Sequence, residues 1–301
     1  VEDGAIKAGI LPAPAKSSAE LRALSQQLPA RPPLLCPGCP HVATEFALRR
    51  LGFYNPCSVG DLPLERKILG QLKRGGLVVA SDIGCYTLAL NPPQQAVDTT
   101  ICMGGSFGLA CGMARVVEAP IIAHLGDSTF FHAGIPPLIN AVYNKANITM
   151  VVLDNSATAM TGFQPHPGTG YTATGEETAS LKAEDVARAC GVKFVEVVNP
   201  FDLKAATETI ERAIRFPGPA VIVSRALCTM IELRDKKKAG VKIVPYHIDQ
   251  DKCSPKCETC IKLLGCPAII KQGDKKVIDA SQCTGCGVCA QVCPYKAIVQ
   301  E

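Results

Sequence analysis

Short, mainly apolar runs alternate with segments of helical periodicity along the middle of the chain. Apolar runs without polar alternation predict buried strands, and a 3.6-residue period predicts helices. Strands are predicted at 77–80, 121–125, 148–153, 193–198 and 220–224, and helices at 104–118, 136–145, 181–190 and 201–215. This alternation predicts an α/β fold with a mostly parallel sheet and helices on both faces.

Polar loops follow several of these predicted strands. They are Ser81-Asp82-Ile83-Gly84-Cys85, Gly126-Asp127-Ser128 and Asp154-Asn155-Ser156. Ligands of open parallel sheets bind at the carboxyl ends of the strands. We therefore expect the chemistry of this domain to lie in these loops.

Composition divides the chain into three parts. Residues 1–30 are rich in Ala, Pro and Ser around an amphipathic run at 18–28, which predicts a linker with one helix. The α/β region occupies 31–245, and a cysteine-dense tail occupies 246–301. The basic stretch at 234–238 is interpreted as a solvated linker.

Composition and charge exclude several classes of protein. Hydrophobic residues make up 47% of the chain and charged residues 19%, which is enough apolar material for a packed core. A net charge of +4 is too small and too scattered to favour nucleic acid. No apolar run is long enough to predict a membrane span. No signal peptide is evident, and a chain that starts at Val1 is typical of a fragment of a longer protein.

Cysteine content indicates the redox compartment. Eight of the 16 cysteines lie between Cys253 and Cys293. A secreted protein could pair this many thiols as disulfides, but the spacing is typical of metal-bound thiolates. We therefore predict a protein of the reducing cytoplasm.

One cysteine array of the tail reads Cys283-x2-Cys286-x2-Cys289-x3-Cys293-Pro294. This is the bacterial ferredoxin spacing, in which three thiolates bind one cluster and the fourth binds another. A zinc site needs only a pair of CxxC units and does not explain the terminal Cys-Pro. The array predicts an iron–sulfur cluster, with zinc as the alternative.

The other array, Cys253-x3-Cys257-x2-Cys260-x5-Cys266-Pro267, ends in the same Cys-Pro but has longer gaps. Beside the regular array it supplies the partner that the crossed fourth cysteine requires. One [4Fe–4S] cluster is assigned to Cys253, Cys257, Cys260 and Cys293, and the other to Cys283, Cys286, Cys289 and Cys266. A [3Fe–4S] centre is the alternative at the irregular array. The tail is thus predicted to be a small α+β ferredoxin-like domain.

A carboxylate and an amide follow two neighbouring predicted strands. Asp127 follows one strand, and Asn155 ends the next strand 28 residues later. Their oxygens suit Mg²⁺ and leave room for a phosphate. The spacing resembles the thiamine-diphosphate motif, although Ser128 replaces its last Gly and Asp154 its first Asn. A structural turn is the alternative.

Five segments carry a specific family resemblance. They are LCPGCPH at 35–41, DIGCYTL at 82–88, DTTICMG at 98–104, GDSTFFHAG at 126–134 and LDNSATAMTGFQPHPGTG at 153–170. Together with the tail, they resemble the alpha subunit of indolepyruvate ferredoxin oxidoreductase. The resemblance covers residues 31–301 and corresponds to the second half of that subunit. The half that carries the pyrimidine-binding domain is not part of this sequence.

The resemblance implies a thiamine-dependent enzyme. Such an enzyme decarboxylates an arylpyruvate on thiamine diphosphate, transfers the acyl group to coenzyme A and passes two electrons through [4Fe–4S] clusters to ferredoxin. A smaller partner subunit completes the assembly. The Glu that activates the cofactor belongs to the pyrimidine-binding domain, so this chain alone is expected to be catalytically incomplete.

The resemblance also implies site residues. Mg²⁺ would be held by Asp127, Asn155 and the Ala157 carbonyl. The helix that opens at Gly104 could receive phosphate, with tight packing as the alternative. His41 and His166 are candidates to face the substrate carboxylate, with a structural histidine as the alternative. The expected cofactor-binding residues are Asp82, Gly84, Cys85, Gly104, Gly126, Asp127, Ser128, Asn155, Ala157 and Thr161.

A third cluster is a further implication of the resemblance. Related 2-oxoacid ferredoxin oxidoreductases hold one beside the thiamine, and the matching positions here are Cys36, Cys39, Cys85 and Cys228. The alternative is that Cys85 and Cys228 are small buried hydrophobes. The remaining cysteines, Cys57, Cys102, Cys111 and Cys190, are interpreted as core or loop residues.

Two other functions stay open from the sequence. The substitutions at Ser128 and Asp154 would suit an iron–sulfur electron-transfer subunit that has lost thiamine chemistry. The same chemistry on pyruvate or 2-oxoglutarate is the other alternative, because sequence does not order the substrate pocket.

Overall fold

The computed structural model describes Ala19, Ala23 and residues 33–52 and 77–300. Residues Leu35–Glu301 form one compact unit, separate from Val1–Leu34. The helix predicted at 18–28 lies almost entirely outside the described residues, and Cys57 lies outside them as well.

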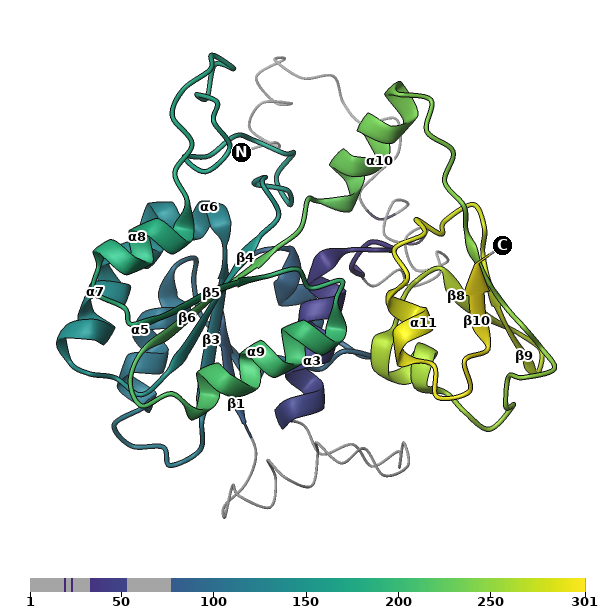
Figure 1. Ribbon diagram of the computed structural model, residues 1–301, viewed down its shortest axis with the longest axis horizontal. Coiled ribbons are helices and arrows are strands. Elements are labelled where there is room, and N and C mark those ends of the chain that lie inside the picture. Colours follow the sequence, from purple (N-terminus) through teal and green to yellow (C-terminus); the bar gives the residue numbers. More distant parts are fainter. Residues whose placement is uncertain (1–18, 20–22, 24–32, 53–76, 301) are drawn as a thin grey trace. The chain divides into compact units, whose positions relative to one another are not determined.

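A six-stranded parallel sheet is the centre of the larger unit (Figure 1). Its strand order is β2-β1-β3-β4-β6-β5, and every pairing is parallel. The strands are β1 (Val78–Ser81), β2 (Thr99–Thr100), β3 (Ile121–Gly126), β4 (Thr149–Asp154), β5 (Phe194–Val198) and β6 (Ala220–Arg225). The predicted parallel α/β sheet is confirmed. Of the six strands of this sheet, β2 was missed, because its two residues are both threonines and give no apolar run.

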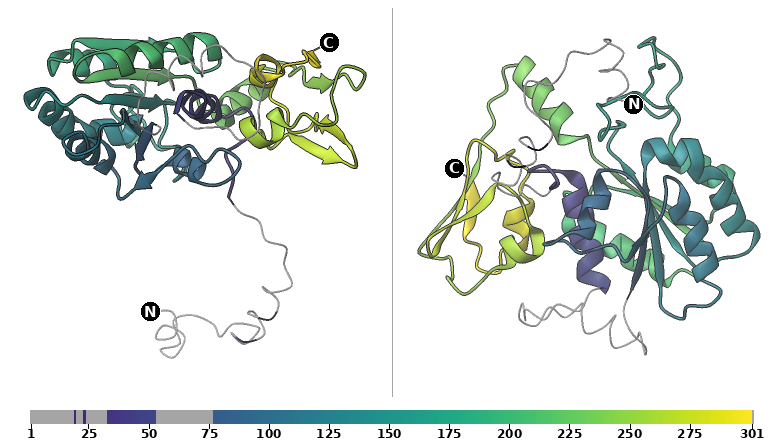
Figure 2. Two further views of the ribbon diagram at one scale, coloured as in Figure 1. Left: turned by 90° about the horizontal axis from the view of Figure 1, so that it is seen from below. Right: turned by 180° about the vertical axis from the view of Figure 1, so that it is seen from behind.

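Helices cover both faces of the sheet, as Figures 1 and 2 show. One core contains α5 (Gly105–Met113), α7 (Ile135–Tyr143) and α8 (Ala183–Ala189). The other contains α3 (Pro40–Gly52) and α9 (Leu203–Arg215). Alternate residues of the central strands enter opposite cores, so Ala123 and Leu125 of β3 face the first core and Ile122 faces the second.

Helix α9 illustrates how local sequence sets these elements. Asp202 caps it, because its side chain accepts a 3.0 Å hydrogen bond from the backbone N–H of Ala205. Ala206, Ile210 and Ala213 recur at helical spacing and are all buried against the sheet. Arg215 lies in the last turn, where a positive charge suits the helix dipole.

The basic stretch at 234–238 is not a linker, so that interpretation was wrong. It forms the last turns of α10 (Thr229–Lys238). Lysines in the last turn complement the helix dipole, and Lys236 forms a 2.7 Å ion pair with Glu232 one turn earlier. Charge composition alone did not distinguish this helix end from a solvated linker.

The described part of the cysteine-rich tail contains two antiparallel strand pairs and two short helical turns. Strand β7 (Tyr246–Ile248) pairs antiparallel with β10 (Ile298–Gln300), and β8 (Ile269–Gln272) pairs antiparallel with β9 (Lys275–Ile278). The turns are η3 (Thr259–Leu264) and α11 (Val288–Val292). The tail is therefore α+β.

The tail shares a hydrophobic core with the sheet domain. Leu264 and Val288 of the tail are buried in one cluster with Val42 of α3 and Leu203 of α9. Gln291 accepts a 3.1 Å hydrogen bond from the Leu203 backbone N–H. The domain boundary at 245–246 stays a prediction. Among the described helices, none is long and apolar enough to cross a membrane.

Candidate functional site

A pocket of about 540 Å³, open to solvent, lies at the carboxyl ends of β1, β3 and β4. Eight of the ten expected cofactor-binding residues line it: Gly84, Cys85, Gly126, Asp127, Ser128, Asn155, Ala157 and Thr161. Asp82 and Gly104 do not line it. Apolar side chains of Met103, Leu153 and Met160 complete the wall.

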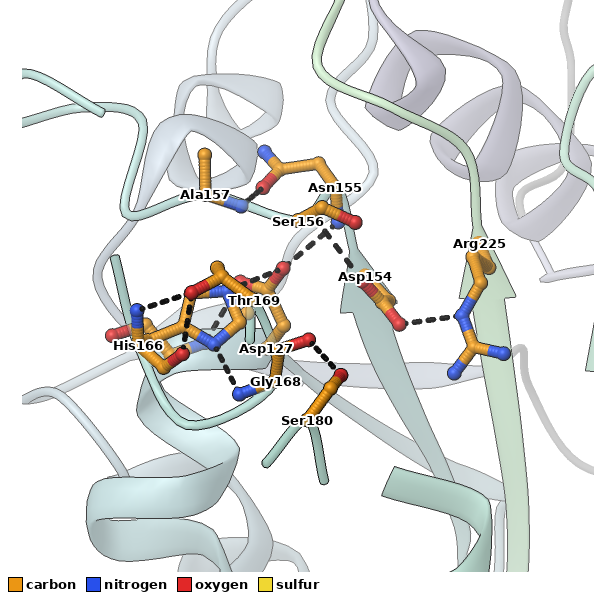
Figure 3. Close-up of polar contacts among 12 residues, drawn as sticks. Asp127, Asp154, Asn155, Ser156, Ala157, His166, Gly168, Thr169, Ser180 and Arg225 are labelled. Carbon is orange, nitrogen blue, oxygen red and sulfur yellow. Dashed lines mark hydrogen bonds and ion pairs between the residues drawn. The ribbon is translucent and has the colours of Figure 1, made fainter. Parts of the chain in front are cut away.

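Asp127 joins the ends of β3 and β4 (Figure 3). Its Oδ1 accepts a 2.7 Å hydrogen bond from the Ser128 N–H, and its Oδ2 accepts one of 3.0 Å from the Asn155 N–H. The residue is buried, and within the described part of the chain its carboxylate pairs with no Lys or Arg. Its charge is therefore available to a cation in the pocket.

Asn155 is held by a turn that its own side chain stabilises (Figure 3). The Oδ1 atom accepts a 3.1 Å hydrogen bond from the Ala157 N–H, and Ser156 between them has a positive φ of 58°. The Nδ2 atom lies 3.1 Å from Nε2 of His41. The turn thus brings Ala157 back to the pocket wall beside Asn155.

His166 contacts Asp127 rather than the pocket (Figure 3). Its Nε2 lies 3.2 Å from Oδ2 of Asp127, and its Nδ1 accepts a 3.2 Å hydrogen bond from the Gly168 N–H. Because Nδ1 is the acceptor, Nε2 carries the hydrogen and faces the carboxylate. The contact is within ion-pair distance but outside hydrogen-bond geometry, so this buried N–H has no aligned acceptor. The ring stacks on Phe131 at 5.9 Å.

Asp154, the last residue of β4, forms an ion pair with Arg225 (Figure 3). Its Oδ2 accepts a 2.6 Å hydrogen bond from Nε of Arg225 in the neighbouring strand β6. The two terminal nitrogens of Arg225 bind the carboxylate of Glu184 at 2.9 and 2.6 Å. Arg225 lowers the pKa of Glu184, whereas burial raises that of Asp154. The ion pair thus explains why an acidic residue, Asp154, stands at the position of the first Asn of the thiamine-diphosphate motif.

Asp82 does not line the pocket but is hydrogen-bonded to Tyr86, which does. Its Oδ2 accepts a 2.6 Å hydrogen bond from the Gly104 N–H, and its Oδ1 accepts one from the hydroxyl of Tyr86. That hydroxyl in turn accepts a 2.9 Å hydrogen bond from the Gly126 N–H. Burial raises the pKa of Asp82 to about 6. Asp82 therefore positions Tyr86, a pocket residue that the sequence analysis did not single out although it lies in a quoted motif.

Gly104 packs tightly instead of lining the pocket. It has a positive φ of 79°, and a Cβ at this position would lie 2.4 Å from that of Ala133. Both facts require glycine here. A role of Gly104 in cofactor binding stays a prediction.

A second polar group is buried beneath His41. Glu45, one helical turn after His41 on α3, lies 3.5 Å from Nε2 of His124, and both side chains are fully buried. Burial raises the pKa of Glu45 well above its usual value and lowers that of His124 to about 3 and that of His41 to about 4. Burial thus disfavours the charged form of each of the three groups.

Four tail cysteines line a second cavity. They are Cys266, Cys283, Cys286 and Cys289, and no charged side chain lines the cavity. Burial and the thiols of Cys286, Cys266 and Cys283 raise the pKa of Cys289 to about 12. The cavity brings Cys266 to the three regularly spaced cysteines of the other array.

The remaining four tail cysteines also lie near one another. Burial raises the pKa of Cys260 to about 11, and the thiols of Cys257, Cys253 and Cys293 contribute to this shift. The Cys293 sulfur accepts a 3.3 Å hydrogen bond from the Ala297 N–H. Cys293 thus lies with the irregular array.

A third group of cysteines lies between the tail cavity and the pocket. Burial raises the pKa of Cys85 to about 11, and the thiols of Cys228 and Cys36 contribute to this shift. Burial also raises the pKa of Cys39, with contributions from the thiols of Cys36 and Cys85. Cys85 lines the pocket and Cys39 lines the tail cavity. Elsewhere, Cys111 is buried in the core, Cys190 is partly buried and Cys102 is exposed.

The donor set of the pocket fits a hard cation bound together with a phosphate. Asp127 and Asn155 offer carboxylate and amide oxygens at adjacent strand ends. Among residues 33–52 and 77–300, no three His, Cys, Asp or Glu side chains converge on one metal position. A cation here therefore needs backbone or phosphate oxygens to complete its ligands.

Comparisons with known proteins match both parts of the chain. The family described as "Thiamine pyrophosphate enzyme, C-terminal TPP binding domain" matches residues 82–224, and that described as "4Fe-4S binding domain" matches residues 276–299. The indolepyruvate oxidoreductase subunit IorA of Archaeoglobus fulgidus is 47% identical over 280 residues. That alignment covers 93% of this chain and 41% of the relative. IorA of Methanothermobacter marburgensis is 44% identical, with 91% and 41% covered.

These matches confirm the resemblance to the indolepyruvate oxidoreductase subunit and the thiamine-binding fold with a ferredoxin-type tail. The chain spans about two fifths of the length of these relatives. A solved 2-oxoglutarate:ferredoxin oxidoreductase from Magnetococcus marinus superposes with a TM-score of 0.53 at 19% identity, covering 67% of this chain and 66% of that one. At this identity, the likeness concerns the fold.

Proposed function

We propose that this chain is the thiamine-binding and electron-transfer part of an oxidoreductase that decarboxylates arylpyruvates such as indolepyruvate. One observation carries the proposal: the pocket of Asp127 and the tail cavity lie in one compact unit, with a group of cysteines between them. A cofactor site and an electron route are thus adjacent. Sequence similarity to IorA supports the choice of substrate class.

Mg²⁺ and thiamine diphosphate are the proposed occupants of the pocket. Asp127 and Asn155 would hold the cation with the Ala157 carbonyl, and the loops that begin at Gly84 and Gly126, which line the pocket, would bind the diphosphate. The bound cofactor supplies the electron sink for decarboxylation. Apolar residues such as Met103 and Met160 exclude water from the reacting centre, and neutral His41 offers its ring at the pocket wall without adding charge.

Two [4Fe–4S] clusters are proposed for the tail. Cys266 with Cys283, Cys286 and Cys289 binds one, and Cys293 with the irregular array binds the other. The cavity and the mutual effects of the thiols on their pKa values support this crossed assignment. The same kind of effect among Cys36, Cys39, Cys85 and Cys228 supports a third cluster.

The remaining participants follow from the relatives. We infer that coenzyme A receives the acyl group, that ferredoxin accepts the electrons, and that a smaller subunit completes the enzyme in the cytoplasm. The 46% identity of 70 residues to the pyruvate synthase subunit PorD of Methanothermobacter marburgensis, which covers 23% of this chain and 79% of PorD, fits a tail that acts as an electron-transfer module.

Cofactor binding and iron content test the function. We expect thiamine diphosphate to bind in the presence of Mg²⁺ and Asp127→Asn to abolish that binding, whereas the exposed Asp235→Asn leaves it unchanged. About eight irons per chain indicate a loaded tail, and about twelve add the third cluster. Absence of thiamine binding, even with the remaining half of the subunit supplied, would instead establish an electron-transfer subunit. Turnover with indolepyruvate, phenylpyruvate and pyruvate then ranks the substrates.

A further inference from the structure

Lys276 is a buried lysine in the ferredoxin-type tail. It lies on β9, its relative exposure is 1%, and it ranks among the largest fully buried side chains. Its Nζ donates hydrogen bonds of 3.1 Å to the backbone carbonyls of Ser254 and Pro255. Both acceptors belong to the gap between Cys253 and Cys257. The lysine therefore reaches across the tail to the irregular cysteine array.

No carboxylate balances this charge. Within the described residues, the Lys276 ammonium forms no ion pair, whereas the exposed Lys262 and Lys271 both pair with Glu258. Burial of an ammonium is costly unless an anion compensates it. Two carbonyl oxygens offer only partial charges. The position of Lys276 thus indicates that an anionic group belongs beside it.

The irregular array provides such an anion when a cluster is bound. The Lys276 ammonium binds the carbonyls of Ser254 and Pro255, the two residues that directly follow Cys253. A [4Fe–4S] cluster with four thiolate ligands is negatively charged in both of its usual oxidation states, and it gains one more negative charge on reduction. The cavity of the other four tail cysteines has no charged side chain in its wall. The two cluster sites therefore differ in their electrostatic surroundings.

We propose that Lys276 is a buried counter-cation that makes the cluster at Cys253, Cys257, Cys260 and Cys293 the easier of the two tail clusters to reduce. This inference rests on the proposed function, since it assumes that both tail clusters are bound. A nearby positive charge stabilises the reduced cluster more than the oxidised one, because the reduced cluster carries more negative charge. The reduction potential of that cluster is raised.

The charge would also give the electron route a direction. Cys39 of the sheet domain lines the cavity of the regular array, so that cluster lies nearer the proposed cofactor pocket. An electron that reaches it moves to the lysine-paired cluster with a gain in free energy. The longer gap between Cys253 and Cys257 then has a purpose, since its two carbonyls hold the ammonium in place.

The test compares two neighbouring lysines of β9 in the whole chain reconstituted with iron and sulfide. Lys276→Met removes the buried charge, and Lys275→Met removes the charge of the adjacent exposed lysine. Redox titration followed by electron paramagnetic resonance gives the reduced fraction of each cluster. At a fixed solution potential, we expect Lys276→Met to lower the reduced-to-oxidised ratio of one cluster at least tenfold, which corresponds to about 59 mV. Lys275→Met should change neither ratio.

A third variant identifies which cluster has shifted. Thr284 lines the cavity of the regular array together with Cys283 and Cys286. Thr284→Val replaces its hydroxyl with a methyl group in this wall, and we expect it to shift the other signal, not the one affected by Lys276→Met. If both variants move the same signal, the assignment of Lys276 to the irregular array is overturned.

Loss of iron in the Lys276→Met variant is resolved by two further substitutions. If Lys276→Arg retains iron and Lys276→Gln loses it, the positive charge is needed at the cluster, as proposed. If both lose it, or if Lys276→Met retains full iron with unchanged potentials, Lys276 is a packing residue and the proposal fails. Absence of iron from the unsubstituted chain would instead overturn the proposed function, so the two failures are distinguishable.

Discussion

His166 presents its Nε2 to Oδ2 of Asp127 at 3.2 Å, from a loop 39 residues further along the chain. The Gly168 N–H fixes which ring nitrogen carries the hydrogen, and Phe131 fixes the plane of the ring. The carboxylate that follows β3 thus has beside it a buried imidazole that comes from outside the pocket. Substitution of a residue that supports a metal ligand typically lowers metal affinity roughly 10- to 100-fold.

We expect His166→Ala to weaken Mg²⁺-dependent binding of thiamine diphosphate by roughly 10- to 100-fold, the range found for residues that support metal ligands. Titration of Mg²⁺ at saturating cofactor, followed by calorimetry, measures this change. His132→Ala is the matched control, because His132 is exposed in the segment after Asp127. Equal affinities of the two variants would show that the contact with Asp127 has no such role.

Glu45 and His124 should make stability depend on pH in opposite directions. Burial raises the folded-state pKa of Glu45, so its unfavourable effect begins above the unfolded-state pKa near 4.3 and grows as pH rises. Burial lowers the folded-state pKa of His124 to about 3, so stability is lost as pH falls below the unfolded-state value of about 6.5. Stability should therefore decline on both sides of mildly acidic pH.

Glu45→Gln isolates the first effect. Relative to the unsubstituted protein, the variant should gain about 1.4 kcal/mol of unfolding free energy for each pH unit above about 4.3, until the folded-state pKa is reached. Urea unfolding at pH 5, 6, 7 and 8 measures the difference. A difference that stays constant over this range would mean that Glu45 is ionised in the folded protein.

Arg225 should contribute to stability through the two carboxylates that it joins. Arg225→Met leaves Asp154 and Glu184 close together without a cation, and we expect a loss of about 2–3 kcal/mol, less than for a fully buried pair because 30% of the Arg225 side chain is exposed. Arg212→Met is the control. Its pair with Glu196 is exposed at 53% and 36%, so a loss below about 1 kcal/mol is expected. Denaturant unfolding compares the two, and similar losses would contradict a special role for Arg225.

Single cysteine substitutions test the crossed ligand sets. Cys266→Ser should alter the same cluster signal as Cys286→Ser, and Cys293→Ser the same signal as Cys257→Ser. Iron analysis and electron paramagnetic resonance report the outcome. Cys190→Ser, outside all three cysteine groups, should leave both signals intact. If Cys266→Ser and Cys257→Ser affect one signal together, the two sets are not crossed.

The sequence determined the elements and the chemistry that follow from local pattern. Apolar runs located five of the six sheet strands, because strands buried on both faces, such as β3, β4 and β6, are mainly apolar. The regular cysteine spacing specified a cluster-binding loop, because three thiolates two residues apart must wrap around one metal group. Asp127 and Asn155 were predicted to lie close together for a similar reason, since residues that follow adjacent parallel strands lie at one edge of the sheet.

Only the tertiary structure decided the roles that depend on residues distant in sequence. Asp82 and Gly104 lie in loops that follow different strands, and the fold joins them by a hydrogen bond. His41 and His166 were equivalent as motif histidines, but the fold places one at the pocket and the other on Asp127. The sequence did not predict the burial of Lys276 and Glu45, because elements distant in the chain pack over these charged side chains.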